Sequence, residues 1–241
     1  MLKTLCGNKS LILWKHNRNN ANVYQPIGDT SYDNFVKEQF IIFFTKLRKK
    51  LVEANYNSFC KLWLTLSDAW KNETSMNLEN FVHNIGLNDK TKILNKMRGN
   101  IGEIFAEQFF QNFGFKYMIF PQTYEPIDPE NERFADAHAD MSDGIKCSIQ
   151  VKNYSGEIPI EILRKACCED CFALREQSDP LRYLSAKRQI LFSFTDKCFS
   201  PLEDDYGKII RLIGPKEIDD DLCDNNSRIF MIDLIIAELS K

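Results

Sequence analysis

FADAHADMSDGIKCSIQVKNY, residues 134–154, contains two runs of alternating polar and apolar side chains on either side of a turn signal, Ser142-Asp143-Gly144. Alternation with a period of two predicts two β-strands, and the Asp-Gly pair between them predicts a hairpin. Asp136, His138 and Asp140 share one face of the first strand. The polar face of the second strand carries Lys146, Ser148, Gln150 and Lys152. The hairpin therefore brings acidic, amide and ammonium groups together.

The register of this hairpin decides which of these groups become neighbours. An ideal two-residue turn at Asp143-Gly144 would place Asp140 opposite Cys147, on the apolar face. One additional turn residue would place Asp140 opposite Ser148 and diagonal to Gln150. We expect the second register, because it joins the two polar faces.

A helix is expected before the hairpin. Its apolar positions recur at steps of three and four as far as Gly114, and Asn88 or Asp89 can cap its start. The helix carries Glu103 and Glu107. Around the hairpin, the sequence predicts strands at 116–120, 188–194 and 207–213, a helix at 160–177, and a strand or helix at 228–239.

The first part of the chain has helical periodicity. A first helix is expected at 31–53, with an apolar stripe formed by Val36, Phe40, Phe43, Leu47 and Leu51. Helical texture continues at 57–70 and 77–87, with breaks expected near 72–75 and at Gly86. We therefore expect a mainly helical subdomain at residues 1–90 and a second, α/β domain at residues 91–241.

Composition limits the class of protein. The chain has 241 residues, 44% of them hydrophobic, and a formal net charge of -3, so long-range attraction to nucleic acid is not expected. No signal sequence or membrane-spanning run is recognised, which favours an intracellular, cytoplasmic protein. The eight cysteines are then expected to be reduced. An iron-sulfur or zinc site is the disfavoured alternative for Cys167, Cys168, Cys171 and Cys198, because their spacing lacks paired CxxC units.

The order of the polar residues is similar to that of a known family. A helical Glu103, an aspartate on the first hairpin strand and Gln150-x-Lys152 on the second resemble the active site of the PD-(D/E)XK nuclease superfamily. The resemblance covers about residues 93–200. Ala139 stands where the family usually has proline, and Gln150 stands where it usually has an acid. QxK variants occur among the restriction and transposition nucleases of the superfamily.

This resemblance implies a restriction-endonuclease-like core, in which helices flank a mixed central sheet. It implies a DNA endonuclease that hydrolyses phosphodiester bonds with Mg²⁺ or Mn²⁺. Asp140 would be the central metal ligand, with Asp136 as the alternative. The other implied site residues are Glu103, Gln150, the backbone carbonyl of Val151, and Lys152, which would assist the attacking water.

Contacts with partners are expected from two kinds of residue. Lys49 and Lys50 of a basic run, and Lys187 and Arg188 at the start of a strand, are candidate contacts to DNA. The neighbouring aromatics of Phe43-Phe44 and Phe109-Phe110 do not share one helix face, which suggests burial against a second copy or a partner subunit. A subunit of a restriction, anti-phage defence or mobile-element system would fit. The alternative is an inactive, nuclease-derived scaffold that binds nucleic acid or protein.

Overall fold

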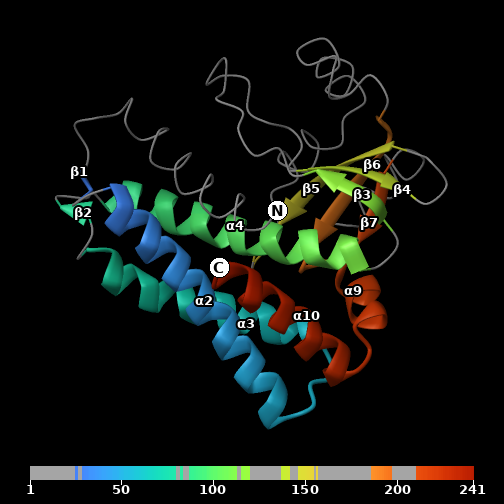
Figure 1. The fold of residues 1–241 in the computed structure, drawn as a ribbon, viewed down its shortest axis with the longest axis horizontal. Helices are drawn as coiled ribbons and strands as arrows, with labels where there is room; N and C mark the ends of the chain where they lie inside the picture. The colour runs from blue at the N-terminus through green and yellow to red at the C-terminus, as the bar shows by residue number, and fades with distance from the viewer. Residues whose placement is uncertain are drawn as a thin grey trace. The chain divides into compact units, whose positions relative to one another are not determined.

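The computed structural model describes residues 25–26, 29–79, 82–83, 87–112, 115–119, 137–141, 146–154, 156, 186–196 and 210–241 (Figure 1). The elements in chain order are β1 (Gln25–Pro26), α2 (Asp29–Glu53), α3 (Phe59–Leu78), β2 (Val82–His83), α4 (Leu87–Asn112), β3 (Phe115–Ile119), β4 (Ala137–Met141), β5 (Lys146–Lys152), β6 (Ala186–Ser193), β7 (Ile210–Ile213), α9 (Pro215–Asp221) and α10 (Asn225–Leu239).

These elements belong to two compact units. The helical unit comprises Met1–Asn57, Lys61–Phe105 and Leu222–Lys241, and the sheet unit comprises Ser58–Cys60 and Ala106–Asp221. Units defined by contacts are not the same as domains that fold alone. The division into residues 1–90 and 91–241 therefore stays a prediction.

Helix α2 is central to the helical unit. Its predicted apolar stripe is confirmed, since Val36, Phe40, Phe43, Leu47 and Leu51 are all fully buried. On the α3 side, Trp70 Nε1 donates a hydrogen bond of 2.8 Å to the carbonyl oxygen of Gln39, and Thr74 Oγ1 donates to Gln39 Oε1 at 3.2 Å. On another side α2 contacts α10 (Figure 1). Two neighbouring helices thus cover α2.

The C-terminal segment is a helix, α10, and not a strand. Asp224 caps it by accepting a hydrogen bond of 2.9 Å from the backbone N–H of Ser227. The buried Arg228 donates from Nε to the carbonyl of Leu222 and from Nη1 to the carbonyl of Tyr56, both at 2.6 Å. These bonds tie the start of α10 to the loop that joins α2 and α3.

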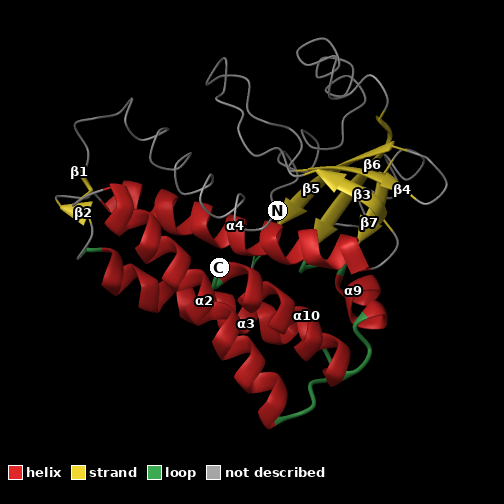
Figure 2. Ribbon diagram, viewed as in Figure 1, coloured by secondary structure: helices red, strands yellow, loops and turns green. Residues whose placement is uncertain are grey.

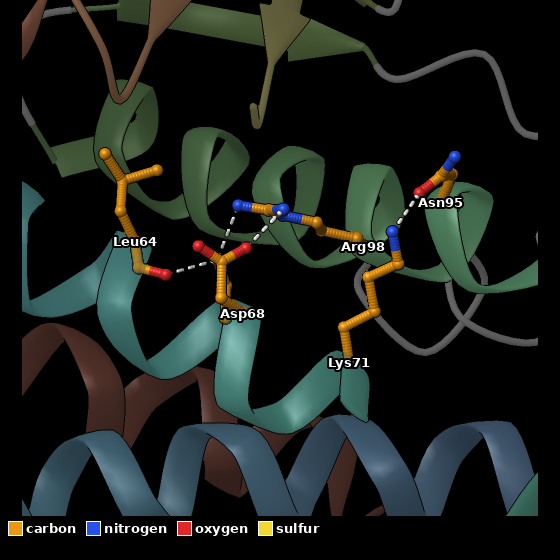
Figure 3. A network of polar contacts seen from close by, with 6 residues as sticks. Leu64, Asp68, Lys71, Asn95 and Arg98 are labelled. Atoms are coloured by element: carbon orange, nitrogen blue, oxygen red, sulfur yellow. Dashed lines mark hydrogen bonds and ion pairs between the residues drawn. The ribbon is translucent and has the colours of Figure 1, made fainter. Parts of the chain in front are cut away.

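Polar bonds hold α4 against α3 within the helical unit (Figure 3). Arg98 Nη1 donates to Asp68 Oδ1 at 2.7 Å, and Nη2 donates to Ser67 Oγ at 3.0 Å. One turn earlier in α4, Asn95 Oδ1 accepts a bond of 2.6 Å from Lys71 Nζ. Together these bonds fix the rotation of this part of α4 about its axis relative to α3.

The sheet unit contains a five-stranded sheet with the order β3-β4-β5-β6-β7 (Figure 2). β4 pairs antiparallel with both β3 and β5, whereas β6 pairs parallel with both β5 and β7. Strands were expected at these places, and the predictions are confirmed for the described residues. β5 lies in the middle of the sheet and is paired with β4 and β6.

The last turns of α4 pack on one face of this sheet. Phe109 and Phe110 contact Phe192 of β6, with ring centroids 5.3 Å and 5.4 Å apart. Phe192 is paired with Val151 of β5, so both residues share the face that α4 covers. The alternate residues of β5, among them Gln150, belong to the other face.

Several expectations were wrong. Helix α3 runs without a break through 72–75, because the buried Thr74 is held by its bond to α2. Val82–His83 is a strand, paired with β1, and not part of a helix. Helix α9 was not predicted. At its start, the backbone N–H of Gly214 donates a hydrogen bond of 2.9 Å to Glu217 Oε2.

The expectation that neighbouring aromatics face a partner was also wrong. All four are buried within the chain. Phe43 and Phe44 both contact Trp63, with ring centroids 4.9 Å and 6.0 Å away, and Phe109 and Phe110 both reach Phe192. In each pair, one aromatic ring of the same chain, Trp63 or Phe192, contacts both consecutive side chains.

Some expectations lie outside the described residues. They are the turn at Ser142-Asp143-Gly144, the helix at 160–177, Asp136, and the cysteines Cys167, Cys168, Cys171 and Cys198. In the part of the chain that the structure describes, no helix combines the length and the apolar character needed to cross a membrane.

Candidate functional site

The register of β4 and β5 decides which polar residues are neighbours. Asp140 is opposite Lys146, and His138 is opposite Ser148. Residues that are directly opposite share a face, so the prediction that the two polar faces adjoin is confirmed. The expected pairing of Asp140 with Ser148 was wrong by two residues. A shift of two residues keeps every side chain on its face, so hydrophobic patterning does not oppose it.

Gln150, Val151 and Lys152 lie in the central strand beyond the described pairing with β4. That pairing ends at Ile149, opposite Ala137, whereas the pairing with β6 continues to Lys152. Among the described residues, the β4 side of this last segment therefore has no strand partner.

The two residues of the QxK motif have different environments. Gln150 is buried, with an exposed fraction of 7%, whereas Lys152 is only half-buried. The backbone of Lys152 is paired with Ser193 of β6, whereas its side chain makes no hydrogen bond or ion pair with any other described residue, so its ammonium is available to a ligand. A buried amide and an available ammonium two residues apart on one face can hold a cation and an anionic group side by side.

Buried polar residues surround Lys152, and the sequence analysis did not identify them. Asn153, the next residue, is buried. Ser193 of β6, which is also buried, is paired with Lys152 in the parallel ladder. Ser193 Oγ donates to the carbonyl of Thr195 at 3.0 Å and accepts from the Thr195 N–H at 3.2 Å. No sequence signal could have found Ser193, because its position beside Lys152 depends on the pairing of strands about 40 residues apart.

Glu103 lies in the helical unit, in α4, and is half-exposed. Glu107 is fully buried in the sheet unit, where its Oε1 accepts a bond of 3.4 Å from Gln111 Nε2. Asn100, one turn before Glu103, is 1% exposed, and neither its Nδ2 nor its Oδ1 has a hydrogen-bond partner. The sequence analysis missed Asn100, although its spacing of three residues from Glu103 places both on one face.

The donor types fit a hard divalent cation in part. Within the sheet unit, Asp140 and Gln150 supply carboxylate and amide oxygens, the donor types that Mg²⁺ and Mn²⁺ prefer. Within the described ranges, however, no group of three or more His, Cys, Asp and Glu residues is assembled. Asp136 lies outside those ranges.

The candidate DNA contacts lie in helix α2 and strand β6. Lys49 and Lys50 both pair with Glu53, at 3.8 Å and 3.0 Å. Hydrogen bonding to Glu53 is the main cause that raises the pKa of the Lys50 ammonium and lowers that of the carboxyl. In β6, Arg188 is paired with Cys147, and Lys187 lies at the shift in register next to it.

Strand β5 thus carries a buried amide, Gln150, and a half-buried lysine, Lys152, on one face. Its interpretation depends on the residues themselves and on their order in the fold. No protein-family model, curated protein or solved structure matches this chain.

Proposed function

We propose that the chain is a metal-dependent nuclease of the PD-(D/E)XK type that hydrolyses phosphodiester bonds of DNA. The observation that carries this proposal is the placement of Gln150 and Lys152 on one face of the central strand β5, directly after the residues of β5 that pair with β4. The order of elements gives further support. Helix α4, the antiparallel strands β3, β4 and β5, and the parallel strand β6 follow the order expected of a restriction-endonuclease-like core.

The observed register favours Asp136 over Asp140 as the central acid. Asp140 is opposite Lys146, four residues before Gln150. Ala137 is opposite Ile149, so one further step along the same register leads from Gln150 to the residue before Ala137, which is Asp136. Asp136 lies outside the described residues, and its pairing with Gln150 is part of the proposal.

The chemistry divides between a cation and the side chains of the chain. Mg²⁺ or Mn²⁺, when bound, would act as a Lewis acid that stabilises negative charge on the scissile phosphate. Asp136, Gln150 and the carbonyl of Val151 would hold the ion, whereas a contribution of Glu103 is implied by the resemblance alone. The Lys152 ammonium would donate a hydrogen bond to the attacking water or to a phosphate oxygen, which orients the water and stabilises developing charge.

The test is the cleavage of supercoiled, linear and single-stranded DNA by the full chain with Mg²⁺, Mn²⁺ or EDTA. Lys152→Ala is expected to lower the cleavage rate about 100-fold or more, as expected when a charge-stabilising donor is removed. Asp136→Asn is expected to lose more activity than Asp140→Asn. Lys216→Ala, which removes an exposed lysine of α9, serves as the matched control. Cleavage that persists in EDTA or in Lys152→Ala would contradict the proposal.

A nuclease-derived scaffold without catalytic activity is the second candidate. It is favoured by Gln150, since an amide binds a divalent ion more weakly than a carboxylate. A scaffold would bind DNA or a partner subunit equally well with and without divalent ions. By resemblance alone, a cytoplasmic restriction, anti-phage defence or mobile-element complex, or a homo-oligomer, would supply recognition and activation.

A further inference from the structure

Helix α10 is apolar on every side, although only one side of it is buried. The buried side is formed by Met231, Ile232, Ile235 and Leu239. A helix that is apolar all round is normally covered all round, because apolar area exposed to water is unfavourable. The outer side of α10 therefore requires an explanation.

The outer side carries Phe230, Leu234 and Ala237. Steps of four and three residues place these side chains on one face of the helix. Phe230 is 60% exposed, Leu234 is 36% exposed, and Ala237 is exposed as well. Single exposed apolar residues are common and need no partner. A phenylalanine and a leucine one turn apart on the same face indicate a contact surface instead.

Helix α2 extends this surface within the helical unit. The two helices are neighbours (Figure 1), and Arg48 of α2 pairs with Asp233 of α10 between two exposed side chains. Val52 lies one turn after Arg48 on α2 and is 60% exposed, so it borders the same surface. The α10 surface, as defined here, consists of Val52, Phe230, Leu234 and Ala237.

We propose that the α10 surface binds the same surface of a second copy of the chain, with the two α10 helices antiparallel. A two-fold dimer joins identical patches, so the patch must be complementary to itself. With the two-fold axis beside Leu234, each Phe230 faces Ala237 of the partner subunit. A large ring opposite a small methyl group allows the helices to approach closely, as facing layers of a core do.

Charge favours the antiparallel orientation. Asp224, which caps the start of α10, is exposed, and the Lys241 side chain after its end is 63% exposed. An antiparallel pair brings each Lys241 toward Asp224 of the partner subunit, whereas a parallel pair would bring the two Asp224 carboxylates together. Lys241 already pairs with Glu238 of its own helix, so this attraction selects the orientation more than it adds affinity.

The size of the surface predicts weak association. Helix α10 has 15 residues. A helix of that length extends over about 22 Å, which covers less than the roughly 800 Å² per partner of a standard interface. We therefore expect a dimer with a Kd in the micromolar range, which sedimentation equilibrium of the full chain from about 1 µM to about 200 µM would measure.

Three variants test the arrangement. Phe230→Gln is expected to weaken the dimer about 100-fold or more, because each dimer loses the ring twice. Met76→Gln is the matched control, since Met76 of α3 is 69% exposed but lies outside the α10 surface, and its dimer is expected to match the wild type. Ala237→Leu is expected to weaken the dimer about 10-fold, because the added atoms fill the place of the partner's Phe230.

The remaining outcomes overturn the proposal. They are a wild-type chain that stays monomeric throughout, a Phe230→Gln dimer as tight as the wild type, and an Ala237→Leu dimer that is tighter, as non-specific apolar attraction predicts. Thermal unfolding at about 1 µM shows what else covers the surface. An equal Tm of Phe230→Gln and wild type agrees with an uncovered monomer. A lowered Tm in a monomeric chain means that another segment of the same chain covers Phe230. These measurements use no DNA or metal, so their result is independent of the proposed nuclease activity.

Discussion

Arg228 offers a quantitative test of how the chain end is held to the helical unit. It is 4% exposed, and its guanidinium donates to the carbonyls of Leu222 and Tyr56 at 2.6 Å, with a longer bond of 3.5 Å to Asn225 Oδ1. Hydrogen bonds from a charged donor contribute about 1.5–3 kcal/mol each. Arg228→Met keeps most of the aliphatic volume but leaves two carbonyls without their donor. We expect it to lower the free energy of unfolding by about 3–5 kcal/mol.

Urea and thermal unfolding, followed by far-UV circular dichroism, would measure this loss. For a chain of this length, each kcal/mol corresponds to about 2–4 °C in Tm, so a decrease of about 6–20 °C is expected. Arg48→Met is the matched control. Arg48 also reaches α10, where it pairs with Asp233, but both side chains are more than 40% exposed, so only a small change is expected. Equal losses in the two variants would refute the argument that burial makes Arg228 important.

Two further predictions concern helices α4 and α10. Gly99→Ala is expected to raise the free energy of unfolding by about 0.5–1 kcal/mol in a urea titration. A Cβ at this helical position meets nothing within 4 Å, and alanine favours the helix. A loss of stability would instead mean that the added methyl group meets a steric conflict. At α10, hydrogen bonds from Ser227 lower the pKa of the Asp224 carboxyl below its ordinary 3.8. The unfolded chain then binds the proton more readily, so this contribution is present above pH 3.8 and is lost as the pH falls through the lowered pKa. Urea midpoints should therefore decrease less on acidification in Asp224→Asn than in the wild type.

Periodicity predicted the elements that bury one face. The stripe of α2 from Val36 to Leu51 and the strands around Ile149 and Phe192 were identified because alternation with period 3.6 or 2 is a property of local sequence. The uninterrupted α3 was missed for a tertiary reason. Polar residues at 72–75 suggest a break, but the bonds of Trp70 and Thr74 to Gln39 stabilise the helix through this stretch.

The register of the hairpin shows where sequence reasoning reaches its limit. Burial of the apolar residues requires Asp140 and Gln150 to share a face, and the sequence predicted this correctly. Which residue of that face lies opposite Gln150 depends on the conformation of the turn, because registers two residues apart bury the same side chains. The observed register therefore changes the proposed central ligand, from Asp140 to Asp136, without changing the proposed chemistry.

Charge pairing limits how the helical unit could bind DNA. The densest basic run of the chain lies in α2, but Lys46 pairs with Glu73, Arg48 with Asp233, and Lys49 and Lys50 with Glu53. A phosphate would have to compete with these carboxylates, so this basic run is expected to attract DNA phosphates only weakly. Together with a net charge of -3, this pairing implies that few phosphates are neutralised on binding, and that affinity for DNA falls only weakly with salt. A nuclease of this kind would depend on the site itself, or on a partner subunit, to hold its substrate.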